Sequence, residues 1–426
     1  MVEPGATIAG ARARRRSVAS WILYDLANTI FSLNIISLYF SLWVVNDKGG
    51  RDGDYLLANS FSMGLMFVAA PFLGAYSDQR PRRIPLLIAS TVVCCLFTVF
   101  LGVWGLAVSL AFFIVANFAY QAGLIFYDAL LPAVSTEENR GRIGGLGVGF
   151  GYLGSLLGLG IGIVTLDVFN GTKPVVFRLT AAAFFLLALP CFFFVREPPK
   201  QVEPVAARQA VRAAVRELRQ TAGRLRQYHG LGRFLVGWIF YADAANTMIA
   251  TMGIYATKEI GFTDSEVQIV LLAGIAGAIP GGILWGRLVD RIDPKRTLML
   301  VLVLWALVMA ATAAIAYLDL GRGFFWAVAP VAGVALGGTW AADRPLMLRL
   351  SPPRYLGQFY GLYAMVGRFA AILGPLLWTV IVDGFGWGRP AAVLSLLVMV
   401  VISAVILVPV DDAPRQWQAG NLETAR

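Results

Sequence analysis

Two matched motifs place acidic side chains inside long apolar segments. The first motif, residues 25–29, reads Asp-Leu-Ala-Asn-Thr, and the second, residues 243–247, reads Asp-Ala-Ala-Asn-Thr. Each follows two aromatic residues spaced by three positions, Trp21 with Tyr24 and Trp238 with Tyr241. A carboxylate in hydrocarbon is costly and usually serves binding or proton transfer. The repeat therefore predicts a duplicated chain whose two acids, Asp25 and Asp243, carry chemistry.

Further polar side chains recur at steps of three and four residues, which places them on one face of each expected helix. An opposite charge, Arg368, lies at about the depth of Asp243 when counted at about 1.5 Å per residue. These two side chains are expected either to pair or to contact a charged solute. The full set of candidate solute or proton residues is Tyr24, Asp25, Asn28, Asn117, Gln121, Asp128, Tyr241, Asp243, Asn246, Trp340 and Arg368.

Proton transfer through these segments would have to use carboxyl groups. The single histidine, His229, lies outside the apolar runs. Burial favours the neutral form of a carboxyl group, so Asp25 or Asp243 is the expected proton carrier. No His/Cys ligand set, phosphate-binding loop or pair of nucleophile and base is present in the sequence, so we expect no metal, no cofactor and no enzymatic activity.

The composition requires a bilayer, because 58% of the residues are hydrophobic and only 14% are charged. Apolar runs of membrane-crossing length are continuous, unlike the alternating strands of a membrane barrel. They predict an all-α membrane protein with twelve transmembrane helices. The runs are 18–45, 55–76, 84–104, 107–131, 143–166, 175–195, 231–256, 267–289, 297–317, 323–348, 355–382 and 391–410.

The net charge of +10 reflects topology rather than nucleic-acid binding. When loops are assigned to alternate sides, 27 Lys and Arg residues fall on the side of the N-terminus, 7 fall on the other side, and Arg368 lies within a run. Positive residues favour the cytoplasmic side, so both termini are expected in the cytoplasm. The three cysteines, Cys94, Cys95 and Cys191, lie in apolar runs and are interpreted as core residues.

Matched features divide the chain into two pseudo-symmetric halves of six helices each. The expected parts are a basic N-terminus at 1–17, a six-helix bundle at 18–196, a linker with a basic amphipathic helix at 197–230, a second bundle at 231–410 and a tail at 411–426. The linker repeats arginine at short helical spacings, which suits a helix lying on the inner leaflet or a solvated topology anchor.

A second pair of motifs ends the second helix of each half. Gly74 precedes Asp78 by four residues, and Gly286 precedes Asp290 by four residues. A carboxylate at a helix end can cap the start of another helix through its exposed N–H groups. The helices beginning near Gly141 and Gly357 are the expected targets. Such contacts would close the cytoplasmic side, while the alternative is that the acids only offset nearby arginines; the expected gate residues are Gly74, Asp78, Arg82, Arg83, Gly286 and Asp290.

This pattern resembles the major facilitator superfamily over nearly the whole chain. The segments 21–28 and 127–132 further resemble its vacuolar amino-acid effluxer branch, which is linked to autophagy and has bacterial relatives. In that superfamily the loop between helices two and three usually reads Gly-x-x-x-Asp-Arg/Lys-x-Gly-Arg-Arg/Lys. Here Gln79 replaces the first basic residue of this motif, and Pro81 replaces its second glycine. The resemblance implies alternating access, in which two bundles rock around a cavity lined by helices one, four, seven and ten.

The sequence therefore predicts a secondary transporter for a small polar solute, such as an amino acid, coupled to protons in the cytoplasmic membrane. Duplicated acids at depth support this class. A lipid or hydrophobic-drug exporter and a receptor or scaffold that moves nothing stay open as alternatives. The expected partners are a solute, protons and the lipid bilayer, with no nucleic acid, and the expected state is a monomer.

Overall fold

The structure, a computed structural model, describes residues 4–50, 52–198, 230–369 and 373–413. The regular structure of these residues is helical, as long apolar segments require, because a helix satisfies its backbone polar groups within itself. The chain forms two compact units. Unit 1 comprises Met1–Glu137, Phe150–Leu218 and Gly357–Leu362, and unit 2 comprises Glu138–Gly149, Arg219–Leu356 and Tyr363–Arg426.

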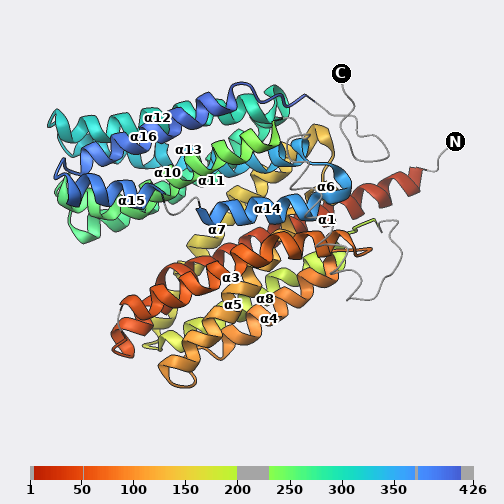
Figure 1. The fold of residues 1–426 in the computed structure, drawn as a ribbon. Coiled ribbons are helices and arrows are strands. Elements are labelled where there is room, and N and C mark those ends of the chain that lie inside the picture. The colour runs from red at the N-terminus through yellow and green to blue at the C-terminus, as the bar shows by residue number, and fades with distance from the viewer. Residues whose placement is uncertain (1–3, 51, 199–229, 370–372, 414–426) are drawn as a thin grey trace. The chain divides into compact units, whose positions relative to one another are not determined.

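Unit 1 is a bundle of long helices from the first half of the chain. Helix α1 packs on α8, and α4 packs on both α5 and α8, while α3 packs on α5; Figure 1 shows these helices side by side in red to yellow-green. The main elements are α1 (Pro4–Phe31), α2 (Tyr39–Leu42), α3 (Asp52–Asp78), α4 (Ile84–Val99), α5 (Leu106–Asp128), α6 (Leu131–Val134), α7 (Arg140–Ile163) and α8 (Lys173–Phe194).

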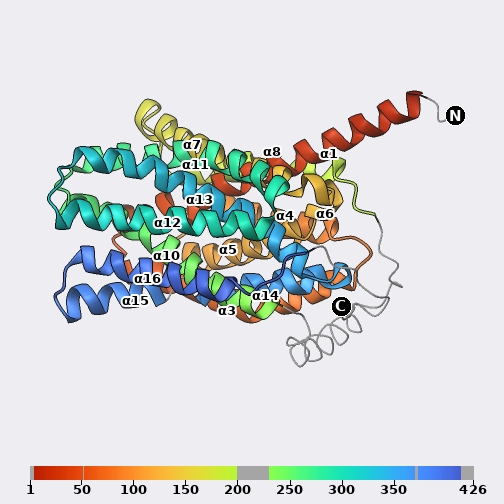
Figure 2. The same cartoon turned by 90° about the horizontal axis from the view of Figure 1, so that it is seen from above.

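Unit 2 repeats this bundle with the second half of the chain. Helix α11 packs extensively on α13, and α12 packs on α13 and α16, while α10 packs on α16; these helices are labelled in both Figure 1 and Figure 2. The elements are α10 (Leu231–Lys258), α11 (Asp264–Ile292), α12 (Pro294–Tyr317), α13 (Gly323–Leu350), α14 (Leu356–Phe369), α15 (Leu373–Thr379) and α16 (Arg389–Leu407).

The units differ from the two expected halves by short exchanged segments. Helix α7 begins in unit 2 and continues in unit 1, whereas the segment Gly357–Leu362 of α14 belongs to unit 1 and the rest of α14 to unit 2. The expected linker helix lies outside the described residues. The fold class predicted from the sequence, an all-α membrane protein, is confirmed.

Where the structure describes them, the expected apolar runs fall on helices. Within the described residues, nine helices are long and apolar enough to cross a membrane, and Ile84–Val99 and Leu373–Gly384 are shorter apolar helices. The remaining run is α10, which carries the polar motif that begins at Asp243. The acid and its amide and hydroxyl neighbours lower the hydropathy of that helix.

Glycines on α7 let α1 approach closely in unit 1. A Cβ added at Gly154 would overlap the backbone carbonyl of Leu26, whereas a Cβ at Gly160 on the same helix meets nothing within 4 Å. Small residues that bring two backbones together are a common basis for helix packing in membranes.

The Gly154→Ala substitution is expected to destabilise the protein by about 1–3 kcal/mol, the usual cost of overpacking. The matched variant Gly160→Ala should be neutral or slightly stabilising, since alanine is the better helix former. Thermal unfolding of the two purified variants measures the difference. Equal melting temperatures would show that α1 and α7 are not held at this distance.

Candidate functional site

Asp78, the last residue of α3, caps the start of α14 within unit 1. Its Oδ1 accepts the Gly357 N–H at 3.0 Å and its Oδ2 accepts the Gln358 N–H at 2.8 Å. One turn earlier, a Cβ added at Gly74 would overlap the Gly357 carbonyl. The glycine therefore admits the backbone that the acid binds. We call Gly74, Asp78, Gly357 and Gln358 the Asp78 clamp.

Asp290 makes the equivalent contact within unit 2. Its Oδ1 accepts the Gly141 N–H at 2.7 Å and its Oδ2 accepts the Arg142 N–H at 2.8 Å, at the start of α7. A Cβ added at Gly286 would collide with the Gly141 carbonyl and with Gly145. We call Gly286, Asp290, Gly141 and Arg142 the Asp290 clamp. Both capping contacts expected from the sequence are present, and each joins a carboxylate to the positive end of a helix.

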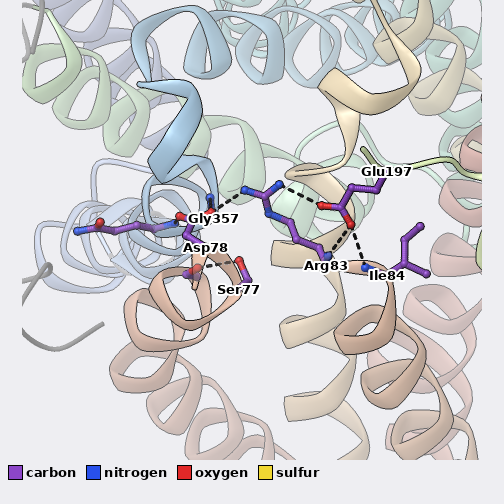
Figure 3. Close-up of polar contacts among 8 residues, drawn as sticks. Ser77, Asp78, Arg83, Ile84, Glu197 and Gly357 are labelled. Atoms are coloured by element: carbon purple, nitrogen blue, oxygen red, sulfur yellow. Dashed lines mark hydrogen bonds and ion pairs between the residues drawn. The ribbon is translucent and has the colours of Figure 1, made fainter. Parts of the chain in front are cut away.

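A buried arginine and a second acid reinforce the Asp78 clamp (Figure 3). Arg83 Nη2 lies 2.6 Å from Asp78 Oδ1, and Arg83 Nη1 lies 3.3 Å from Glu197 Oε1. Glu197 Oε2 also accepts the backbone N–H groups of Arg83 and, at 3.3 Å, of Ile84 at the start of α4. The three side chains are only 2–6% exposed. One guanidinium thus holds two carboxylates out of water.

Within the described residues, the Asp290 clamp has no equivalent ion pair. Lys295, which follows Asp290 as Arg83 follows Asp78, donates its Nζ to the Val408 carbonyl at 2.6 Å. Among the described residues, no ion pair joins Asp290. Asp412 matches Glu197 in accepting a helix-start N–H, that of Lys295, at 2.9 Å. Each clamp therefore makes two hydrogen bonds to a helix start, but among the described residues only the acid of the Asp78 clamp also forms a buried ion pair.

Arg82, grouped with Arg83 by the sequence analysis, lies apart from this cluster. It is exposed, whereas Arg83 is buried. The neighbouring Arg80 stacks on the Tyr76 ring at 4.8 Å from the ring centre. Of the expected basic gate residues, Arg83 alone contacts a clamp acid among the described residues.

The candidate residues of α1 are buried in unit 1. The Tyr24 hydroxyl shares a 2.6 Å hydrogen bond with Thr91, and its ring stacks on Tyr127. Asp25 and Asn28 are 6% and 3% exposed. The Asn28 amide nitrogen has no hydrogen-bond partner among the described residues. Tyr24 is therefore a packing residue, and Asn28 offers a donor.

The candidate residues of α5 form a short polar chain in unit 1. The Gln121 amide donates to Asn117 Oδ1 at 3.4 Å, and the Asn117 amide donates to Asn59 Oδ1 on α3 at 3.1 Å. Asp128 is half-buried at the end of α5. Three amides in sequence across two helices provide donors and acceptors for a polar solute.

Asp243 binds a backbone N–H of α15 in unit 2. Its Oδ2 accepts the Gly374 N–H of α15 at 2.8 Å, and its Oδ1 accepts the Thr247 hydroxyl at 3.4 Å. It is fully buried. The proposed partner Arg368 lies on α14, but its side chain is outside the described part of the structure. Asn246 and Trp340 are half-buried on α10 and α13.

The sequence analysis missed two sets of contacts that the fold assembles. Those of Glu197 are one set, and their only signal was an acid two residues beyond an apolar run, as at Asp412. The other surrounds Asp343, whose Oδ2 accepts the Tyr363 hydroxyl at 2.7 Å and the Trp238 Nε1–H at 3.2 Å. Trp238 could be found as the repeat of Trp21, whereas Tyr363 carries no such signal.

Models of two protein families match the chain. The model of the Major Facilitator Superfamily matches residues 25–242, and the model described as vacuole effluxer Atg22 like matches residues 135–418. The chain belongs to the major facilitator superfamily, whose members are transporters and not enzymes. Within that class, it belongs to the Atg22-like vacuole effluxer family. The resemblance read from the sequence is confirmed.

Similar proteins include a full-length bacterial relative. The chain is 27% identical over 418 residues to the uncharacterized MFS-type transporter YxiO of Bacillus subtilis (strain 168), covering 92% of this chain and 94% of YxiO. It is 26% identical over 310 residues to autophagy-related protein 22-1 of Penicillium rubens, covering 66% of this chain and 51% of the fungal protein.

Solved structures show the same fold at low sequence identity. The human organic anion transporter MFSD10 superposes with a TM-score of 0.72 at 16% identity, covering 92% of this chain and 99% of that chain. The proton:xylose symporter XylE also gives a TM-score of 0.72 at 14% identity, covering 93% and 95%. The protein is thus a multi-pass membrane protein with the major facilitator fold.

Proposed function

We propose that the protein moves a small polar solute, such as an amino acid, across the cytoplasmic membrane by alternating access coupled to protons. The observation that carries the proposal is the pair of clamps at Asp78 and Asp290. Each holds a helix start by two hydrogen bonds to a single carboxylate. Such contacts can form and break within a transport cycle, because a hydrogen bond to a charged group contributes only about 1.5–3 kcal/mol of stability.

Both clamps belong to the cytoplasmic side in this proposal, since they lie beside the arginine-rich loops. Closed clamps seal that side, and their release opens it. Both termini then lie in the cytoplasm, and we propose that a monomer is sufficient because each half contributes one clamp.

The buried polar groups of unit 1 support a small polar solute. Asn28 has an unsatisfied amide donor among the described residues, and Asp25 lies one turn before it on α1. The amide chain through Gln121 and Asn117 adds further donors and acceptors. A zwitterionic solute can pair with the buried carboxylate and amides. Such pairing is favourable because a buried polar group without a partner is costly.

Uptake of pooled radiolabelled amino acids into proteoliposomes tests this function. Accumulation should require an imposed pH gradient and vanish with a protonophore. Asn117→Ala should reduce uptake on the order of tenfold, since it breaks the amide chain. Ser395→Ala is the control, because Ser395 bonds only locally, to the Ala392 carbonyl. Uptake that does not depend on the pH gradient would contradict proton coupling. Folded protein that takes up no amino acid would contradict amino acids as the cargo.

An apolar groove in unit 1 favours a second candidate function, transport of a hydrophobic compound. The groove, of about 920 Å³, lies between α3 and α5 and is lined by Phe61, Leu65, Val68, Ile114 and Phe118 among others. Export of a lipophilic dye that falls when Phe61 is changed to Asn, with amino acids inert, would favour this candidate. Dye export that is unchanged by Phe61→Asn would leave the groove as a lipid-facing surface.

A further inference from the structure

Asp343 on α13 is a fully buried acid that neither clamp uses. One of its carboxylate oxygens, Oδ2, accepts the Tyr363 hydroxyl at 2.7 Å and the Trp238 indole N–H at 3.2 Å. The rings of Trp238 and Tyr363 lie against each other, with centroids 4.1 Å apart. These two neutral donors stabilise the ionised form of Asp343.

A third aromatic residue, Tyr241, completes the cluster from α10. It is fully buried, and its hydroxyl has no hydrogen-bond partner among the described residues. It lies one turn beyond Trp238 on α10, on the same side of the helix as the indole that donates to Asp343. A phenol hydroxyl can accept a hydrogen bond as well as donate one. Tyr241 is therefore suited to receive a hydrogen bond from a protonated Asp343.

We propose that Asp343 is the proton-binding site of unit 2. In the ionised state its carboxylate is held by Trp238 and Tyr363. In the protonated state its O–H donates to the Tyr241 oxygen. The only bond made is that between the carboxylate and a proton from water, and the proton returns to water on release. This inference rests on the proposed proton-coupled transport, and it names the acid that carries the proton.

Asp243, which the sequence pattern favours together with Asp25 as a proton carrier, makes a structural contact instead. Its Oδ2 accepts the Gly374 N–H of α15. Protonation would weaken that hydrogen bond to a buried backbone group. Asp243 is thus a positioning residue, and Asp343 has neighbours that accommodate both of its protonation states.

Other side chains near α13 influence the pH at which Asp343 titrates, but they do not take its place as the proton-binding group. Helices α11 and α12 also pack on α13, but Trp285 bonds to the Val334 carbonyl and Trp305 bonds to Thr339. Arg344 follows Asp343 directly in the chain. A positive charge near a carboxylate favours the ionised form, and Arg344 is present in every variant compared below.

Tryptophan fluorescence of the purified full-length protein tests the site without any solute. The chain has 11 tryptophans, so the signal of Trp238 is taken as the difference between the native protein and Trp238→Phe. That difference should show one transition with pH, and Asp343→Asn should abolish it. Tyr241→Phe should move the midpoint to lower pH and Tyr363→Phe to higher pH, each by on the order of one pH unit.

The control is Tyr255→Phe, also on α10, because Tyr255 donates to the Thr312 carbonyl and not to Asp343; its midpoint should not move. A transition that persists in Asp343→Asn, or tyrosine variants that shift the midpoint in the same direction, would overturn the inference. The tyrosine variants decide the matter even where Asp343→Asn fails to fold. If the fluorescence transition is present but solute uptake does not depend on the pH gradient, the proton coupling of the proposed function would be overturned instead.

Discussion

Asp78→Asn is expected to shift the protein from the clamped to the released state on the order of tenfold. Hydrogen bonds to a charged group are worth about 1.5–3 kcal/mol, and 1.4 kcal/mol corresponds to a factor of ten. Asparagine removes the charge from both N–H contacts with α14 and from the contact with Arg83. Asp290→Asn removes two such contacts and no ion pair, so its shift should be smaller.

Distances between spin labels at exposed Arg15 and Arg354 would report this shift. The native cysteines Cys94, Cys95 and Cys191 are buried, so labelling can be directed to the introduced sites. A longer and broader distance distribution is expected for Asp78→Asn. An unchanged distribution would mean that Asp78 only balances the charge of nearby arginines.

Arg83→Met is expected to destabilise the protein by about 3–5 kcal/mol, the typical cost of removing one partner from a buried ion pair. The change would leave the Asp78 and Glu197 carboxylates without the guanidinium that separates them, at 2% and 4% exposure. The double variant Arg83→Met/Glu197→Gln should recover part of the loss, since it removes one of the two uncompensated charges.

Thermal unfolding of the purified variants measures this effect. Arg82→Met is the control, because Arg82 is exposed beside the buried Arg83; its melting temperature should match that of the native protein. If Arg83→Met and Arg82→Met melted together, Arg83 would be a surface charge, and the asymmetry between the two clamps would have no energetic basis.

The sequence was sufficient for the parts of the clamps that depend on local spacing. Gly74 and Asp78 lie four residues apart, which places them on one face of a helix, and the duplication repeats this at Gly286 and Asp290. The capped helices could be named because glycines mark their starts near Gly141 and Gly357. Helix periodicity and a repeated motif are properties of short segments, so they can be read without the tertiary fold.

The sequence did not predict contacts that join distant segments. Glu197 reaches Arg83 across 114 positions, and Tyr363 reaches Asp343 from another helix. Asp243 was expected to meet either Arg368 or a solute, but its carboxylate accepts a backbone N–H of Gly374. Any backbone N–H can serve such a role, so residue type gave no signal. These partners are chosen by helix packing, which a single sequence does not specify.

Two label pairs measured in one protein test alternating access most directly. One pair is Arg15 with Arg354, and the other is Gly105 with Gly323, where an added side chain meets nothing within 4 Å. In the double variant Asp78→Asn/Asp290→Asn, the first distance should lengthen while the second shortens. Two distances that stay fixed, or that lengthen together, would contradict a transporter whose two sides open in turn.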